Sequence, residues 1–130
     1  MQRDFFYLSW ADFDATVARL AHDLRQFDCT GVYGVPRGGL VLAVAISHHL
    51  GLPLLDREQN GMIWVDDIVD TGKTFSEING QPVAKACIVN LNPKISIFSA
   101  FQLHHKPWVV FPWEDKERAE QDMKQFLCSR

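Results

Sequence analysis

Apolar residues between positions 9 and 27 recur at helical spacing and predict a helix there. Steps of four, three, four and three positions place five of them on one face: Phe13, Val17, Leu20, Leu24 and Phe27. Ser9 and Asp12 have the spacing of a capping box. The helix is therefore expected to begin at Ser9 and to bury its apolar face in a core.

After this helix, short apolar runs alternate with helical patterns. Strands are predicted at 31–35, 52–55, 62–65 and 83–89, with weaker candidates at 95–98 and 108–111. Helices are predicted at 40–50, 73–78 and 114–127, and loops at 56–61 and 66–72. This alternation predicts an α/β three-layer sandwich around a mainly parallel sheet. Ligands of such sheets bind where strands end, which directs attention to 36–39 and 66–74.

Length and composition indicate one globular domain over 1–130, because 130 residues hardly allow a second core. The net charge of -3 provides no basic surface for nucleic acid, so an anionic ligand must be held by local geometry. No apolar stretch is long enough to span a bilayer, and the first residues lack the apolar core of a signal peptide. Cys29, Cys87 and Cys128 lack CxxC spacing and are expected to be reduced thiols of a cytoplasmic protein.

The most informative stretch is Val65-Asp66-Asp67-Ile68-Val69-Asp70-Thr71-Gly72-Lys73-Thr74. Its second half lies at a predicted helix N-terminus, where backbone N–H groups and the hydroxyls of Thr71 and Thr74 favour a phosphate. Asp66 and Asp67 would repel a bare phosphate, but they suit a ligand that also brings a ribose diol and a magnesium ion. The combination indicates a ribose 5-phosphate.

This stretch has two other possible interpretations. Gly72-Lys73-Thr74 matches the end of a P-loop, but Asp67 stands where that motif requires its first glycine. A solvated acidic turn without a ligand is the second alternative. The run of a strand, three aspartates and a hydroxyl-rich turn favours a ligand site over either.

A second candidate loop is Pro36-Arg37-Gly38-Gly39, between a predicted strand and helix. The two glycines let the backbone approach an anion closely, and Arg37 offers a forked donor. A glycine-rich turn without a ligand is the alternative interpretation.

The run Val65 to Thr74 resembles the motif of type I phosphoribosyltransferases that binds 5-phosphoribosyl 1-pyrophosphate (PRPP). Similarity extends to Trp10 with the first helix and to the stretches 33–41 and 108–114, and is greatest to the xanthine-guanine members of the family. The resemblance implies transfer of 5-phosphoribose from PRPP to xanthine, guanine or hypoxanthine, giving a nucleoside 5'-monophosphate and pyrophosphate. It also implies Mg2+ as cofactor, a homodimer or homotetramer, and no nucleic-acid or membrane partner.

The resemblance assigns roles residue by residue. Asp66 and Asp67 match the pair that holds the ribose hydroxyls and helps to place the metal, with Asp67 nearer the ion. Asp70 matches the residue that takes the purine N7 proton, and Arg37 belongs to the pyrophosphate loop, so these two are the implied catalytic residues. The implied substrate-binding residues are Arg37, Gly38, Gly39, Asp66, Asp67, Asp70, Thr71, Gly72, Lys73, Thr74, Trp108 and Val109.

The resemblance also implies three structural details. Family members often have a cis peptide before the residue matching Arg37, so a cis bond is predicted at Pro36–Arg37. Trp108 matches an aromatic residue that stacks on the purine, although a core tryptophan is the alternative. Val109 matches a residue whose backbone reads the base.

The chain departs from the family pattern at two places. Only 56–61 occupies the interval of the family's hood and long flexible loop, so a reduced hood and a short loop are expected. Asn92-Pro93 stands where the family has a lysine that contacts the purine 6-oxo group, and Lys94 follows. Two alternatives therefore stay open: a non-catalytic PRPP- or nucleotide-binding regulatory module, and a transferase acting on another base.

Overall fold

The computed structural model describes residues 4–128, which form two compact units. One unit is Thr16–His104, and the other combines the chain up to Ala15 with the chain from His105 onward. The elements follow the order β1 (Phe5–Tyr7), α1 (Trp10–Leu24), β2 (Gly31–Gly34), α2 (Gly38–Leu50), β3 (Leu54–Leu55), β4 (Met62–Val69), α3 (Lys73–Ser76), β5 (Ala84–Asn90), β6 (Phe98–Gln102), β7 (Trp108–Val110) and α4 (Lys116–Cys128).

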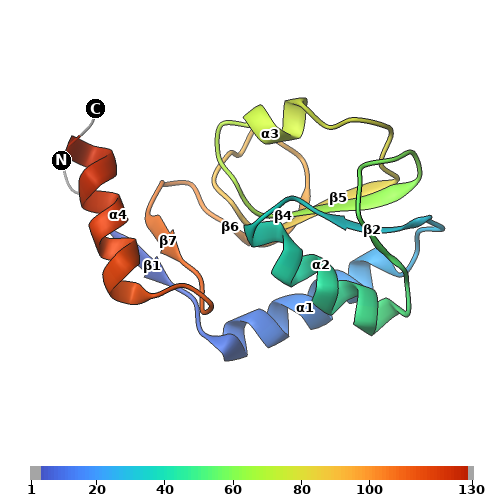
Figure 1. Cartoon of the computed structure of the whole chain (residues 1–130), viewed down its shortest axis with the longest axis horizontal. Helices are drawn as coiled ribbons and strands as arrows, with labels where there is room; N and C mark the ends of the chain where they lie inside the picture. The colour runs from blue at the N-terminus through green and yellow to red at the C-terminus, as the bar shows by residue number, and fades with distance from the viewer. Residues whose placement is uncertain (1–3, 129–130) are drawn as a thin grey trace. The chain divides into compact units, whose positions relative to one another are not determined.

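The unit Thr16–His104 contains a five-stranded sheet in the order β3-β2-β4-β5-β6, and every pair of neighbours is parallel. Figure 1 shows α2 on one side of this sheet and α3 on the other. The predicted α/β architecture around a mainly parallel sheet is confirmed. Because the strands are parallel, the loops that follow β2 and β4 leave from the same edge.

The core of this unit lies along the central strands. Strands covered on both faces are expected to be almost continuously apolar, and β4 begins with four fully buried residues, Met62, Ile63, Trp64 and Val65. Helix α2 has no Asp, Glu, Lys or Arg and buries Leu42, Ala43 and Ile46. The apolar face predicted for the first helix is also buried at Leu20 and Leu24.

The second unit contains the parallel pair β1 and β7, helix α4 and a group of aromatic rings. Phe5 lies opposite Trp108 in the register of the two strands. The Phe111 and Trp113 rings stack with centroids 4.9 Å apart, and the Trp113 ring meets Phe13 edge to face at 5.6 Å.

The predicted start of the first helix is confirmed. Ser9 N–H donates to Asp12 Oδ2 at 2.8 Å, and Asp12 N–H donates to Ser9 Oγ at 3.0 Å, which is the reciprocal capping box. Within residues 4–128, no helix combines the length and apolar character needed to cross a membrane. Cys29 and Cys87 are free thiols, whereas the side chain of Cys128 lies outside the described residues.

Several boundaries differ from the prediction. The loop predicted at 66–72 is wrong in its first half, because β4 continues to Val69 and pairs with β5 as far as Asn90. The strand predicted at 95–98 is also wrong, since β6 only begins at Phe98. Strand β1 was not predicted, because three residues are too few for a period to be recognised.

Candidate functional site

Asp66 and Asp67 lie near the carboxyl end of β4 rather than in a loop. Asp66 is only 8% exposed, and Asp67 is half-buried. Asp67 N–H donates to Asp66 Oδ1 at 2.8 Å, and Ile68 N–H donates to Asp67 Oδ1 at 2.8 Å. These bonds between successive residues fix both carboxylates relative to the strand.

The two carboxylates are electrostatically coupled. Burial is the main reason that the pKa of Asp66 is raised to about 8; the hydrogen bond and negative charge of Asp67 act in the same direction, and the Asp67 N–H acts in the opposite one. Without a ligand, Asp66 therefore holds its proton at neutral pH. A cation or a hydroxyl donor at this pair would favour the charged form.

Replacing Asp66 by Asn is expected to stabilise the ligand-free protein at pH 8. The pKa of Asp66 is raised from 3.8 to about 8 on folding, so its contribution to stability is fully present below pH 3.8 and is lost as the pH rises toward 8. Asn cannot ionise, so the variant should gain on the order of 1–3 kcal/mol over the parent at pH 8 and little at pH 4. Urea unfolding at both pH values measures the difference.

Asp56→Asn is the matched control, because the Asp56 side chain is 89% exposed in the connection between β3 and β4. Its effect on the unfolding free energy should be small and nearly independent of pH. An equal gain from Asp66→Asn at pH 4 and pH 8 would contradict a protonated, buried Asp66.

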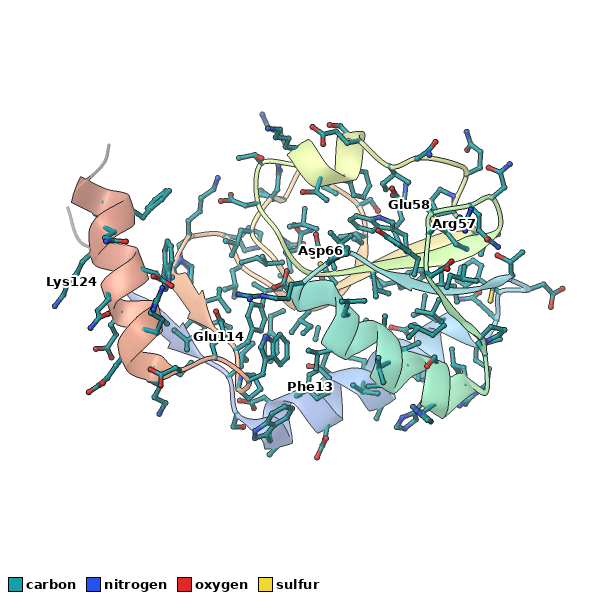
Figure 2. The ribbon with its side chains drawn as sticks, viewed as in Figure 1. Phe13, Arg57, Glu58, Asp66, Glu114 and Lys124 are labelled. Atoms are coloured by element: carbon teal, nitrogen blue, oxygen red, sulfur yellow. The ribbon has the colours of Figure 1, made fainter. Side chains whose placement is uncertain are left out.

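The loop after β2 lies directly against this pair. The Pro36–Arg37 peptide bond is cis, as predicted. A Cβ built on Gly39 would lie 2.9 Å from the Val65 carbonyl oxygen, and one built on Gly38 would overlap Asp67 Oδ2. A side chain at Gly39 would press on the β4 backbone, and one at Gly38 would displace the Asp67 carboxylate. Figure 2 shows Asp66 beside the start of α2. Arg37 is the exposed N-cap residue of α2.

The loop after β4 forms a pocket of about 150 Å³. Gly72 caps α3 with φ 87°, a left-handed conformation that favours glycine, and Lys73 N–H donates to Thr71 Oγ1 at 3.3 Å. Thr71, Lys73 and Thr74 are exposed at its rim. The pocket is lined by Asp66, Ile68, Val69, Asp70, Thr71, Gly72, Lys73, Thr74 and Phe75.

Asp66 connects the two loops, since it lines this pocket and its Oδ1 lies 3.5 Å from a Cβ built on Gly39. The structure thus brings the predicted residues Gly38 and Gly39 against Asp66 and Asp67, and it brings Asp66 into one pocket with residues 70–74. Arg37 directly precedes Gly38 in the first of these loops. Trp108 and Val109 belong to the other unit, where the Trp108 ring lies 5.4 Å from the Phe126 ring. Their contact with a purine stays a prediction.

Sequence reasoning missed how the pocket is supported. Phe75 lines the pocket, its ring meets Trp64 edge to face at 5.9 Å, and Lys85 Nζ lies 4.5 Å from its centre. Asn90 is fully buried at the end of β5. The sequence does carry a signal for each residue. Phe75 is the aromatic residue directly after the hydroxyl-rich turn, and Asn90 is an amide at the end of an apolar strand.

The side chains at this site that could bind a metal ion are the adjacent carboxylates of Asp66 and Asp67. In residues 4–128, no group of three or more His, Cys, Asp or Glu side chains is arranged to hold a metal. Magnesium is commonly bound by one or two carboxylates together with substrate oxygens and water. The all-oxygen pair Asp66 and Asp67 fits that coordination.

No protein-family model matches the chain. The xanthine-guanine phosphoribosyltransferase of Chromohalobacter salexigens is 27% identical over 135 residues, with 84% of this chain and 83% of that protein covered. The enzyme of the same name from Idiomarina loihiensis is 27% identical over 140 residues, covering 84% and 86%. The crystal structure of a purine phosphoribosyltransferase from Pyrococcus horikoshii has a TM-score of 0.71 and 28% identity over 86% of this chain and 95% of that one.

Proposed function

Because the chain has the type I phosphoribosyltransferase fold and is related in sequence to xanthine-guanine phosphoribosyltransferases, we propose that it is a purine phosphoribosyltransferase. It transfers 5-phosphoribose from PRPP to xanthine, guanine or hypoxanthine and releases pyrophosphate. The family resemblance further supports a homodimer or homotetramer located in the cytoplasm.

One observation carries the proposal: an acidic pair, with Asp66 buried and Asp67 half-buried, lies between two loops suited to anions. The Gly38–Gly39 backbone adjoins Asp66 and Asp67, and the pocket of residues 70–74 shares Asp66. Carboxylates at a phosphate site are costly unless the ligand also brings hydroxyl donors or a cation. PRPP meets this requirement, since it carries a 5-phosphate, a vicinal diol and a pyrophosphate that binds magnesium.

Each group has a role in this proposal. Amides and hydroxyls of Thr71–Thr74 bind the 5-phosphate, and Asp66 and Asp67 accept hydrogen bonds from the ribose hydroxyls. Asp67, with Asp66, would hold Mg2+, which when bound neutralises charge on the pyrophosphate oxygens. Arg37 and the glycine backbone stabilise the negative charge that grows on pyrophosphate as its bond to C1 breaks.

The reaction is a displacement at C1 with inversion. Purine N9 forms the bond to C1 as the C1–O bond to pyrophosphate breaks, and the N7 proton passes to Asp70, which lies in the pocket beside the 5-phosphate loop. Trp108 stacks on the base and the backbone of Val109 reads its edge, as the family resemblance implies. Asp70 and Arg37 are thus the proposed catalytic residues.

The proposal predicts pyrophosphate release from PRPP only when a purine and Mg2+ are both present. A screen of xanthine, guanine, hypoxanthine, adenine and pyrimidines, with chromatographic detection of the nucleotide, measures it. At least one 6-oxopurine should give its monophosphate, and omission of Mg2+ should abolish the product. Product formation with a pyrimidine alone would instead support a transferase acting on another base.

A second candidate, a non-catalytic module that binds PRPP or a nucleotide, is favoured by the short connection 56–61. Glu58 Oε2 accepts from Asn79 N–H at 3.3 Å, Asn60 Oδ1 accepts from Gln81 N–H at 2.8 Å, and Gly61 N–H donates to Gln81 O at 2.9 Å. Figure 2 labels Glu58 and Arg57 on this connection. A segment fastened in this way is poorly suited to closing over PRPP and excluding water. Calorimetric binding of PRPP without any product would favour this candidate.

A further inference from the structure

Asn90 is the last residue of β5 and is 0% exposed. Its Nδ2 donates to the Ile95 carbonyl oxygen at 3.0 Å and to Gln102 Oε1 at 2.9 Å, and its Oδ1 accepts from Asn92 N–H at 2.9 Å. A buried amide is costly unless it is hydrogen-bonded, and here both N–H groups and the oxygen are engaged. Asn90 therefore binds the segment that follows it as well as strand β6.

The segment held by Asn90 is a compact turn over 91–95. Leu91 N–H donates to the Val69 carbonyl oxygen at 2.8 Å, which joins the turn to the end of β4. Lys94 N–H donates to Asn92 Oδ1 at 3.0 Å, and Ile95 N–H donates to the Asn92 carbonyl oxygen at 3.1 Å. The side-chain amide of Asn90 is thus bonded to this turn at two points, the N–H of Asn92 near its start and the carbonyl oxygen of Ile95 at its end.

Ile95 in turn touches the phosphate loop. A Cβ built on Gly72 would lie 2.8 Å from Ile95 Cδ1, so the side chain lies directly against the Gly72 backbone. Gly72 is the left-handed N-cap residue of α3 and lines the 150 Å³ pocket. The chain of contacts runs from Asn90 through the Ile95 backbone and side chain to the phosphate loop.

We propose that Asn90 is a positioning residue for the phosphate loop: it holds Ile95 against Gly72 and so keeps the pocket of residues 70–74 in its binding geometry. The inference rests on the proposed function, because the pocket is taken to bind the 5-phosphate of PRPP. Asn90 is not one of the residues that line the pocket, so its effect on the ligand is exerted through Ile95.

Asn90→Asp tests the proposal with almost no change in volume. An aspartate has no N–H groups: when ionised it places negative oxygens against the Ile95 carbonyl, and when burial keeps it protonated it can donate only one of the two bonds. The dissociation constants of PRPP and of ribose 5-phosphate should rise on the order of tenfold, as expected when a buried acceptor loses its partner. Isothermal calorimetry measures both, and kcat at saturating PRPP should change little.

Gln102→Ala is the matched control. It removes the other acceptor of Asn90 Nδ2, but it leaves the bonds to Ile95 and Asn92 in place. Both variants should lower Tm, and only Asn90→Asp should weaken the binding of ribose 5-phosphate. Equal weakening by both variants, or by neither, would overturn the proposal.

Ile95→Ala completes the test and does not depend on whether Asn90→Asp folds well. It removes the side chain against Gly72 and leaves the carbonyl bonded to Asn90, so it should also weaken ribose 5-phosphate binding. If Asn90 acts through Ile95, the double variant should lose less affinity than the sum of the single losses. Additive losses would mean that Asn90 acts by another route.

A parent protein that binds neither PRPP nor ribose 5-phosphate overturns the proposed function and this inference together, whereas normal binding by the variants overturns the inference alone.

Discussion

Gly38→Ala is expected to weaken PRPP binding by roughly 100-fold, the equivalent of about 2.7 kcal/mol and within the usual 1–3 kcal/mol cost of overpacking. A Cβ at position 38 would overlap Asp67 Oδ2. Asp67 cannot simply turn aside, because its Oδ1 accepts from Ile68 N–H at 2.8 Å. The extra methyl group must therefore displace either the loop after β2 or one of the two carboxylates. Calorimetric titration with PRPP and Mg2+ measures the loss.

Gly51→Ala is the control for Gly38→Ala, since it makes the same chemical change at the other end of α2. A Cβ at Gly51 meets nothing within 4 Å, but its φ of 64° is left-handed. The control should lose about 1 kcal/mol of stability and keep the parent's affinity for PRPP. If Gly38→Ala bound PRPP like the parent, the acidic pair and the loop after β2 would not form one site.

The alternation of strands and helices was predictable because strands that are buried on both faces of a sheet consist of nearly continuous apolar residues. Helix α2 lies within two residues of its predicted start, and β2, β5 and β7 each lie within two residues of their predicted bounds. These elements form the core, so their apolar residues and their spacing indicate where they lie in the sequence. The parallel order of the strands followed from the fold class rather than from any single residue.

The errors occurred where polar residues occupy strand positions. The sequence predicts that Asp66 and Asp67 begin a loop, since aspartate is depleted in strands. In the structure, each carboxylate accepts the N–H of the next residue, and β4 pairs with β5 on both sides of them. Local side-chain bonds of this kind leave no periodic signal. Side-chain bonding also explains the wrong strand prediction at 95–98. Ile95 lies in the turn bonded to Asn90, and β6 begins only at Phe98.

The residues that line the pocket after β4 could be located from their motif, but the residues that support the pocket from behind could not. Asp66, Asp70 and the Thr71–Thr74 turn could be located because their chemistry is concentrated in one run of sequence. Asn90 is 18 positions after Gly72 in the chain and reaches it only through a contact with Ile95. A contact between distant residues depends on the tertiary fold, and nothing in the spacing of the sequence specifies it.

Asp70→Asn is expected to lower kcat by about 10²–10⁴-fold, the usual contribution of a general base, and to leave PRPP binding nearly unchanged. Asp70 directly follows β4 and lines the pocket beside Thr71, so an amide of the same size keeps the local packing. The amide cannot accept the N7 proton as purine N9 bonds to C1. Steady-state kinetics with the preferred purine, together with calorimetric titration of PRPP, separate the loss of rate from any loss of binding.

Asp67→Asn provides the contrast that makes this experiment decisive. Asp67 is assigned to the ribose hydroxyls and the metal, so its replacement should raise the dissociation constant of PRPP in the presence of Mg2+. The two variants remove one carboxylate each, at positions three residues apart. A loss of affinity in Asp67→Asn and a loss of kcat in Asp70→Asn would separate binding from proton transfer. Parental turnover by Asp70→Asn would leave the N7 proton to water or to another group, and Asp70 would then be a binding residue only.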